Sequence, residues 1–202
     1  MLNLFARGHV DRVTDPVGRW LVDRGLSPDV ITVAGTVGAV AGAVGLLPWG
    51  GLIGGPLVIT AFVLLDLVDG AMARARGYGT PFGAVLDSTC DRIVDGALFA
   101  SLAWWCLVGG DERIAGAAAL VCLVGGQLVS YVKARAESVG LAAEGGLVER
   151  AERLILGLLG AFLAGLGVPY ALPAALLLLA VGTVVTLAQR VVAVRRSAVE
   201  RA

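Results

Sequence analysis

Four aspartates between residues 66 and 91 have the spacing of a metal centre. Asp66 and Asp69 stand three residues apart, and Asp87 and Asp91 stand four residues apart. Spacings of three and four place the members of each pair on one face of a helix. A lone carboxylate in hydrocarbon is costly, so four carboxylates at the ends of apolar segments indicate a shared cation.

The segment between the two pairs favours a reversal of the chain, with Gly77, Gly79 and Pro81 as turn residues. An antiparallel helix pair would bring the four carboxylates together at the membrane boundary. Hard oxygen ligands suit magnesium or manganese, and three or four carboxylates could hold two such ions. Two close metal ions are a common device for transfer at phosphorus, because they stabilise the attacking and leaving oxygens.

Small residues and an arginine beside the aspartates indicate a ligand that carries phosphate. Gly70 and Gly83 remove side chains where a ligand would approach the backbone. Arg74, one helical turn beyond Gly70, offers a cation for a phosphate group. Such a site suits a phosphate head group whose tail stays in the bilayer.

Two other interpretations also explain carboxylates in apolar segments. Salt bridges with Arg74, Arg76 and Arg92 would account for single Asp–Arg pairs, but less well for four acidic groups that share two helix faces. A cation-coupled transporter also uses membrane carboxylates. Transporter sites usually lie near the midplane between repeats, whereas this cluster lies at one edge and no repeat is visible.

Membrane helices must position these side chains. Of the 202 residues, 57% are hydrophobic and 16% are charged, and the mean hydropathy is +0.85, which is typical of a polytopic membrane protein. We expect an all-α fold in a single domain, 1–202, with a six-helix transmembrane core at 26–202. The apolar runs long enough to span cover 29–47, 52–73, 84–108, 114–132, 154–168 and 170–192.

Basic residues gather on one side of these spans. They precede the first span, surround the second and fourth connections and close the chain, whereas Arg113 lies on the opposite side. The positive-inside rule therefore places both termini and the aspartates at the cytoplasmic face of the cell membrane. Small residues in the first span allow close helix packing, either within one chain or between two: Gly35, Gly38, Gly42 and Gly45.

Residues 1–25 predict a juxtamembrane helix that lies on the membrane surface. Val17 and Trp20 belong to an apolar face with helical spacing, and Asp15 and Arg19 belong to a charged face. The sequence "GLSP" that follows predicts a helix end at Gly25 and a new start, with Ser27 as N-cap and Pro28 as first helical residue.

Composition excludes several other site types. Cys90, Cys106 and Cys122 lack paired spacing, so neither a disulfide framework nor a zinc site is indicated. His9 is the single histidine, which excludes a histidine-based triad. The net charge is zero, and we expect no nucleic-acid partner.

The aspartate region resembles the CDP-alcohol phosphatidyltransferases, whose signature is D-x2-D-G-x2-A-R-x8-G-x3-D-x3-D. It matches at every fixed position: Asp66, Asp69, Gly70, Ala73, Arg74, Gly83, Asp87 and Asp91. The resemblance implies transfer of a phosphatidyl group from CDP-diacylglycerol to an alcohol, with release of CMP. It also implies two Mg²⁺ ions, with Mn²⁺ as the other metal considered, and a homodimer.

The resemblance also implies residue roles. Asp66, Asp69 and Asp87 would bind metal, and Asp91 would serve as a ligand of the second metal and as the general base. The CDP-diacylglycerol site would be lined by Gly70, Ala73, Arg74, Thr80 and Gly83. The family usually reads T-P-N-x-x-T where this chain has "SPDVIT", so Asp29 and Thr32 are expected to contact the CDP group.

The acceptor alcohol differs among subfamilies, so residues outside the signature must indicate which alcohol is used. Basic residues near the fourth connection suit an acceptor that carries phosphate, although cytoplasmic loops are basic in any case. The stretches "SYVKARAESVG" and "LDSTCDRIVDGALF" resemble the actinobacterial phosphatidylinositol phosphate synthases. That resemblance implies 1D-myo-inositol 3-phosphate as acceptor, with Lys133, Arg153 and Arg190 on its phosphate. A synthase using glycerol 3-phosphate, a transporter and a catalytically silent lipid-binding scaffold remain the alternatives.

Overall fold

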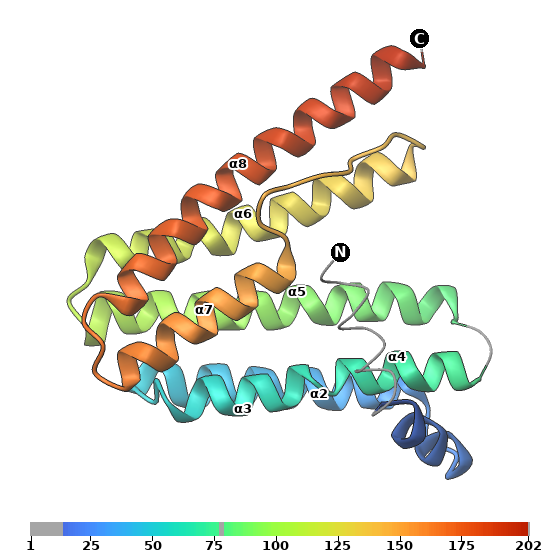
Figure 1. The fold of residues 1–202 in the computed structure, drawn as a ribbon, viewed down its shortest axis with the longest axis horizontal. Helices are drawn as coiled ribbons and strands as arrows, with labels where there is room; N and C mark the ends of the chain where they lie inside the picture. The colour runs from blue at the N-terminus through green and yellow to red at the C-terminus, as the bar shows by residue number, and fades with distance from the viewer. Residues whose placement is uncertain (1–13, 77–78, 202) are drawn as a thin grey trace. The chain divides into compact units, whose positions relative to one another are not determined.

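The computed structural model describes residues 14–76 and 79–201, except for the side chains of Asp66 and Leu67. The predicted all-α fold is confirmed, because the described residues form helices joined by turns and short loops, with no strand among them (Figure 1). Two compact units are distinguished, Met1–Gly42 with Leu57–Val94, and Ala43–Pro56 with Asp95–Ala202. Each unit is described by itself, and the single-domain organisation stays a prediction.

The surface helix begins, in the described part of the chain, at Thr14 and ends at residue 23. Its predicted end is confirmed: Gly25 has φ +80°, and the Leu26 N–H donates to the Leu21 carbonyl at 3.2 Å. These are the features of a Schellman cap, where glycine adopts the left-handed conformation without strain. The part of the predicted surface helix before Thr14 lies outside the described residues.

The next helix starts where the sequence predicts it. α2 begins at Pro28, and the Ser27 hydroxyl accepts a hydrogen bond from the Val30 N–H at 3.3 Å. This bond satisfies one of the N–H groups that a helix start leaves without a partner. A proline fits the first helical position because its missing N–H would have no partner there.

The first unit contains most of α2 and α3, all of α4 and the first half of α5. Their bounds are α2 Pro28–Leu46, α3 Gly54–Val63, α4 Asp66–Ala75 and α5 Pro81–Trp104. In this unit α2 lies tightly against the end of α3. A Cβ added at Gly38 would overlap the Phe62 ring, and one at Gly42 would lie 2.7 Å from Val58 Cγ1. The small-residue face of α2 therefore serves packing within the chain at these two positions.

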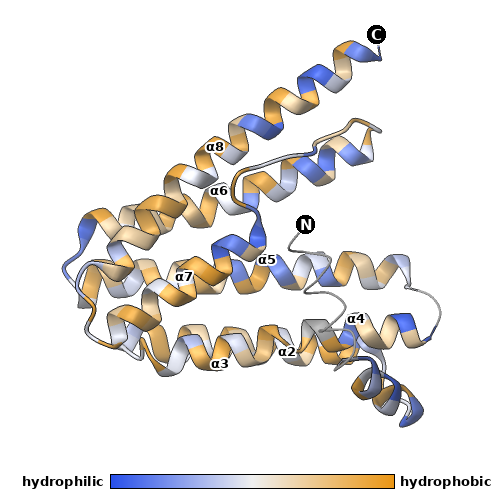
Figure 2. Cartoon of the chain, in the orientation of Figure 1, coloured by the Kyte–Doolittle hydropathy of each residue, from blue (hydrophilic) through white to orange (hydrophobic). Residues whose placement is uncertain are grey.

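The second unit is built around α8 (Ala171–Glu200), against which α6 (Arg113–Ser138) and α7 (Arg150–Gly165) pack. Two short segments complete it, the 3₁₀ helix η1 (Leu47–Trp49) and the π-helix η2 (Trp105–Gly109). The buried face of α8 has helical spacing and no exposed side-chain area at three leucines: Leu172, Leu176 and Leu179. Figure 2 shows that the hydrophilic residues of α6 and α8 gather on their later turns.

The chain is a multi-pass membrane protein by the length and hydropathy of its helices. Among the described residues five helical stretches are long and apolar enough to span: Pro28–Trp49, Gly54–Ala75, Pro81–Gly109, Arg113–Ser138 and Ala171–Glu200. The predicted span 154–168 corresponds to α7, which has only 16 residues. A sixth span therefore stays a prediction.

Candidate functional site

The signature aspartates lie on two helices of the first unit. Asp66 and Asp69 belong to the first turns of α4, and Asp87 and Asp91 lie one turn apart on α5. The Asp69 carboxylate is buried, Asp91 is half-buried and Asp87 is exposed. The predicted helical spacing within each pair is thus confirmed, whereas the Asp66 side chain lies outside the described part.

A buried hydrogen bond connects α2 to the signature. The Thr32 hydroxyl donates to the Asp69 carboxylate, and the two side chains are 5% and 9% exposed. The same hydroxyl lies 3.1 Å from the Pro28 carbonyl oxygen, one turn earlier on α2. Because hydrogen bonds to an ionised carboxylate are stronger than those between neutral groups, this contact fixes the orientation of Asp69.

The start of α5 faces a second residue of α2. Thr80 caps α5, since its hydroxyl accepts a hydrogen bond from the Gly83 N–H at 2.9 Å. A Cβ added at Gly83 would lie 3.0 Å from Thr80 Oγ1 and 3.5 Å from Asp29 Oδ1. Only a residue without a side chain leaves this space open between the threonine and the Asp29 carboxylate.

α2 is therefore the shared neighbour of both halves of the signature. Asp29 and Thr32 stand three residues apart, on one helix face, and reach α5 and α4 respectively. Of the residues predicted to line a nucleotide, the structure brings Asp29, Thr80 and Gly83 together.

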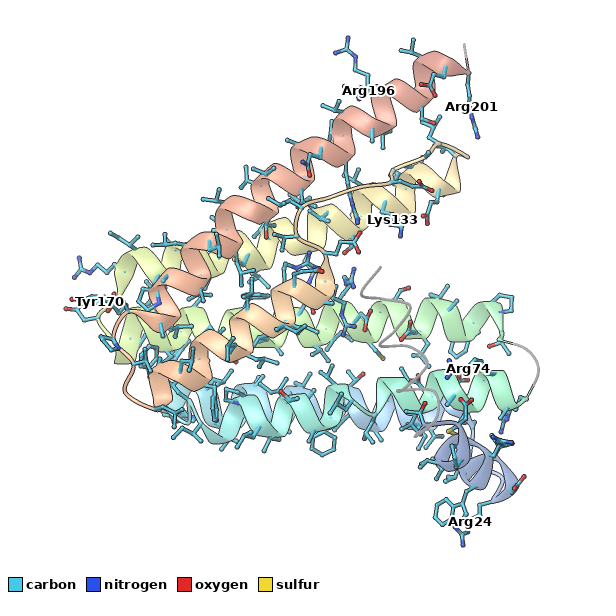
Figure 3. The ribbon with its side chains drawn as sticks, in the orientation of Figure 1. Arg24, Arg74, Lys133, Tyr170, Arg196 and Arg201 are labelled. Atoms are coloured by element: carbon cyan, nitrogen blue, oxygen red, sulfur yellow. The ribbon has the colours of Figure 1, made fainter. Side chains whose placement is uncertain are left out.

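The Arg74 side chain lies close to Gly70 of the same helix. Its Nη1 is 3.6 Å from the place that a Gly70 Cβ would occupy, and its Nη2 pairs with Asp15 Oδ1 of the surface helix at 3.1 Å. This pair is well exposed to solvent, so it contributes little to stability. Figure 3 shows Arg74 on α4. The third predicted residue of this helix, Ala73, is half-buried.

Arg92 pairs with a signature aspartate, since its Nη2 lies 3.5 Å from Asp91 Oδ2. Arg76, by contrast, donates to the Leu26 carbonyl oxygen at 2.8 Å. The salt-bridge interpretation therefore fits the Arg92–Asp91 pair, whereas the Arg76 contact is with the backbone.

The carboxylates have the donor chemistry of a site for a hard divalent cation. Among side chains that the structure describes, no group of three or more His, Cys, Asp or Glu could hold a metal ion. One of the four predicted ligands, Asp66, is not among those side chains. Convergence of all four carboxylates on metal thus stays a prediction.

The second unit contains a buried arginine paired with an aspartate. Arg153 is 1% exposed, and its Nη2 lies 3.1 Å from Asp95 Oδ2. Arg150 Nε lies 3.5 Å from the other carboxylate oxygen of Asp95. A Cβ added at Gly126 of α6 would lie 3.2 Å from Arg153 Nε, so a glycine is what leaves room beside the guanidinium.

The other two predicted acceptor residues have partners of their own. Arg190 Nη1 donates to the Val129 carbonyl oxygen at 2.9 Å, and its Nε donates to the Gly145 carbonyl oxygen at 3.1 Å. Lys133 is exposed on α6, and its Nζ is 4.0 Å from Glu137 (Figure 3). Arg153 and Arg190 thus both contact α6, at residues three positions apart.

Sequence reasoning missed Asp95 and Gly126. Asp95 was detectable in principle, since it continues the spacing of four that runs through Asp87 and Asp91. Its importance was hidden because its two arginine partners are more than fifty residues away in the chain. Nothing in the sequence around Gly126 distinguishes it from the other glycines of the apolar helices.

The chain is similar to known proteins over nearly its whole length. A sequence model of the family described as CDP-alcohol phosphatidyltransferase matches residues 26–194. The phosphatidylinositol phosphate synthase of Streptomyces avermitilis is 50% identical over 99% of this chain and 85% of that protein. The synthase of the same name from Mycolicibacterium smegmatis is 50% identical over 96% of this chain and 89% of that protein.

Solved structures of a similar protein share the fold. The crystal structure of Mycobacterium tuberculosis phosphatidylinositol phosphate synthase with CDP-DAG bound has a TM-score of 0.89 and 50% identity, covering 92% of this chain and 95% of that chain. The same protein in complex with manganese and citrate has a TM-score of 0.88 and 50% identity, covering 91% and 90%.

Proposed function

The chain belongs to the CDP-alcohol phosphatidyltransferase family, and we propose that it is a phosphatidylinositol phosphate synthase. It would transfer the phosphatidyl group of CDP-diacylglycerol to 1D-myo-inositol 3-phosphate and release CMP in phospholipid synthesis. The observation that carries the choice of a phosphorylated acceptor is Arg153, a fully buried cation whose Nε and Nη1 make no hydrogen bond to described residues. Buried N–H groups normally have partners, so these two suit the oxygens of an anionic acceptor.

The reaction exchanges one bond to phosphorus for another. In our proposal Asp91 takes the proton of the acceptor hydroxyl, because a sugar hydroxyl is a poor nucleophile at neutral pH. The acceptor oxygen then bonds to the phosphorus next to the diacylglycerol, and CMP leaves with the electrons of the bond that breaks. When bound, divalent ions would stabilise the attacking and leaving oxygens.

The proposal assigns the ions to the signature carboxylates. Asp66, Asp69 and Asp87 would hold metal, with Asp91 as a ligand of the second ion. Two Mg²⁺ ions are our choice, with Mn²⁺ as a substitute; the manganese in the structure of the mycobacterial relative supports a divalent cation. The Thr32 hydroxyl would keep Asp69 oriented toward the ion.

The CDP group would lie where α2 meets the starts of α4 and α5. Asp29 and Thr32 would contact it from α2, and Gly70, Ala73, Arg74, Thr80 and Gly83 would line its diphosphate and nucleoside. The open space at Gly83 and the position of Arg74 over Gly70 support this assignment. Binding of an anionic diphosphate there would compete with Asp15 for the Arg74 guanidinium.

The acceptor phosphate would be held by Lys133, Arg153 and Arg190. A guanidinium gives planar, directional hydrogen bonds to phosphate oxygens, and a lysine adds a mobile charge. We further propose a homodimer in the cell membrane, with both termini and the active site on the cytoplasmic side. The clustering of basic residues on that side supports this orientation.

Release of CMP tests the proposal. Purified protein with CDP-diacylglycerol and Mg²⁺ is given inositol 3-phosphate, glycerol 3-phosphate, free inositol or serine in separate assays. We expect release with inositol 3-phosphate alone. Release with glycerol 3-phosphate alone would keep the metal chemistry and replace the acceptor, because the same basic residues suit any phosphate monoester. No release with any acceptor would favour the transporter or the scaffold.

A further inference from the structure

We propose that Asp95 is a positioning residue for the acceptor phosphate, acting by holding the Arg153 guanidinium with two of its nitrogens open. The inference rests on the proposed function and deepens it, because it names the feature that makes the enzyme select a phosphorylated acceptor over the free alcohol.

The geometry of the pair supports a positioning role. Asp95 is 4% exposed and Arg153 is 1% exposed, and they meet through a single hydrogen bond of 3.1 Å between Oδ2 and Nη2. Arg153 Nε and Nη1 form no hydrogen bond to the described residues. A carboxylate that accepted hydrogen bonds from two guanidinium nitrogens would leave fewer donors for a ligand. The single hydrogen bond to Asp95 therefore leaves Nε and Nη1 available.

The second oxygen of Asp95 also has a cationic neighbour. Arg150 Nε lies 3.5 Å from Oδ1, whereas Arg153 Nη2 lies 3.1 Å from Oδ2. Both arginines come from the first turn of α7, whereas Asp95 comes from α5. Each oxygen of the carboxylate thus lies beside a different guanidinium, which limits how the carboxylate can turn.

The open donors of Arg153 point to an anionic ligand. Its Nε and Nη1 are buried and form no hydrogen bond to the described residues. Burying such donors without acceptors is costly. A phosphate monoester supplies several acceptor oxygens together with negative charge, whereas a free hydroxyl supplies a single neutral acceptor.

Gly126 lets the Arg153 guanidinium lie close to α6. A Cβ there would lie 3.2 Å from Nε and 3.4 Å from Cζ, tight enough to force one of the two groups to move. The glycine and the aspartate therefore act on the same guanidinium. The glycine gives it space beside α6, and the aspartate sets the direction in which the donors point.

The test compares two Michaelis constants within one variant. In Asp95→Asn the amide still accepts a hydrogen bond from Nη2, but the charge that orients Arg153 is gone. We expect the KM for inositol 3-phosphate to rise about tenfold, the size of effect that follows from weakening a hydrogen bond to a charged group. The KM for CDP-diacylglycerol should change less than twofold. The preference for inositol 3-phosphate over free inositol, as a ratio of kcat/KM values, should fall about tenfold.

A merely structural role predicts a different pattern. Lower yield or lower stability would reduce the amount of active enzyme and leave both KM values and the acceptor preference unchanged, which would overturn the inference. If Asp95→Asn does not fold, Asp95→Glu decides, because its longer side chain displaces Arg153 while keeping the charge pair. A raised acceptor KM in Asp95→Glu supports the inference, and an unchanged one overturns it.

Asp111→Asn is the matched control. Asp111 also pairs with an arginine, Arg113, but at 3.9 Å and with both side chains almost fully exposed. The control should leave both KM values as in the wild type. The wild-type acceptor panel separates the two proposals: use of glycerol 3-phosphate alone would contradict the proposed function, and the Asp95 comparison would then be made with that acceptor. If the wild type released no CMP with any acceptor, both the proposed function and the Asp95 inference would be overturned.

Discussion

The Thr32 hydroxyl of α2 donates a hydrogen bond to the Asp69 carboxylate of α4, across 37 residues of sequence and with both side chains buried. One residue of this pair belongs to the aspartate signature, and the other does not. The contact means that a helix outside the signature orients one of its carboxylates, so the proposed metal site depends on how α2 packs.

Replacing Thr32 by valine tests this dependence. Valine keeps the shape of threonine but cannot donate to Asp69, so the carboxylate loses a support of the kind that typically changes metal affinity about tenfold or more. We expect the Mg²⁺ concentration for half-maximal CMP release to rise by about tenfold. Thr32→Ser keeps the hydroxyl and should stay near the wild type. Equal Mg²⁺ dependence of valine and serine variants would contradict a supporting role.

Asp91→Asn should separate binding from turnover. An amide cannot take the acceptor proton, and loss of a general base typically costs about 10²–10⁴ in rate. We therefore expect CMP release to fall by at least about a hundredfold, while CDP-diacylglycerol still raises the melting temperature of the purified protein. A rate of CMP release near that of the wild type would contradict the assignment of Asp91 as the general base.

Arg153 and Lys133 should differ in their effect on the acceptor. Arg153 is 1% exposed and Lys133 is exposed, so removal of the arginine takes away a far better desolvated charge. We expect Arg153→Ala to raise the KM for inositol 3-phosphate more than Lys133→Ala does, with the KM for CDP-diacylglycerol little changed in either. Arg113→Ala, on a well exposed pair, is the control. Equal rises of both KM values would argue against an acceptor pocket.

Gly18 in the surface helix should be intolerant of any side chain. A Cβ there would lie 2.9 Å from the Met72 backbone nitrogen and 3.0 Å from Ala71. Backbone atoms cannot step aside as a side chain can, so we expect Gly18→Ala to cost about 1–3 kcal/mol and to lower the melting temperature in detergent. Gly45→Ala on α2 is the control, because nothing lies within 4 Å of its added Cβ. A melting temperature that is equal in the two variants would show that the surface helix can shift without cost.

Removal of divalent ions should stop the reaction. Carboxylates that lack their cation repel one another, and some of them take up protons. We expect EDTA to abolish CMP release, and added Mg²⁺ or Mn²⁺ to restore it. Activity that persists in excess EDTA would exclude the proposed metal chemistry.

Local features of the fold were predictable because they depend on residues close together in the chain. The Schellman end at Gly25 and the cap at Ser27 follow from conformational preferences within one turn. Hydropathy over about twenty residues identifies a membrane helix, because the bilayer has a fixed thickness. The short α7 is the exception, since its 16 residues are fewer than the roughly 20 that usually span a bilayer.

The sequence by itself therefore determined the apolar helices, the aspartate signature and the uneven distribution of basic residues among the connections, all of which are properties of contiguous segments. Only the tertiary structure decided that Thr32 supports Asp69, that Asp29 faces Gly83 and that Asp95 holds Arg153. These contacts join residues 37 to 58 positions apart. Such pairs depend on which helix faces pack together, and hydropathy alone does not distinguish one apolar face from another.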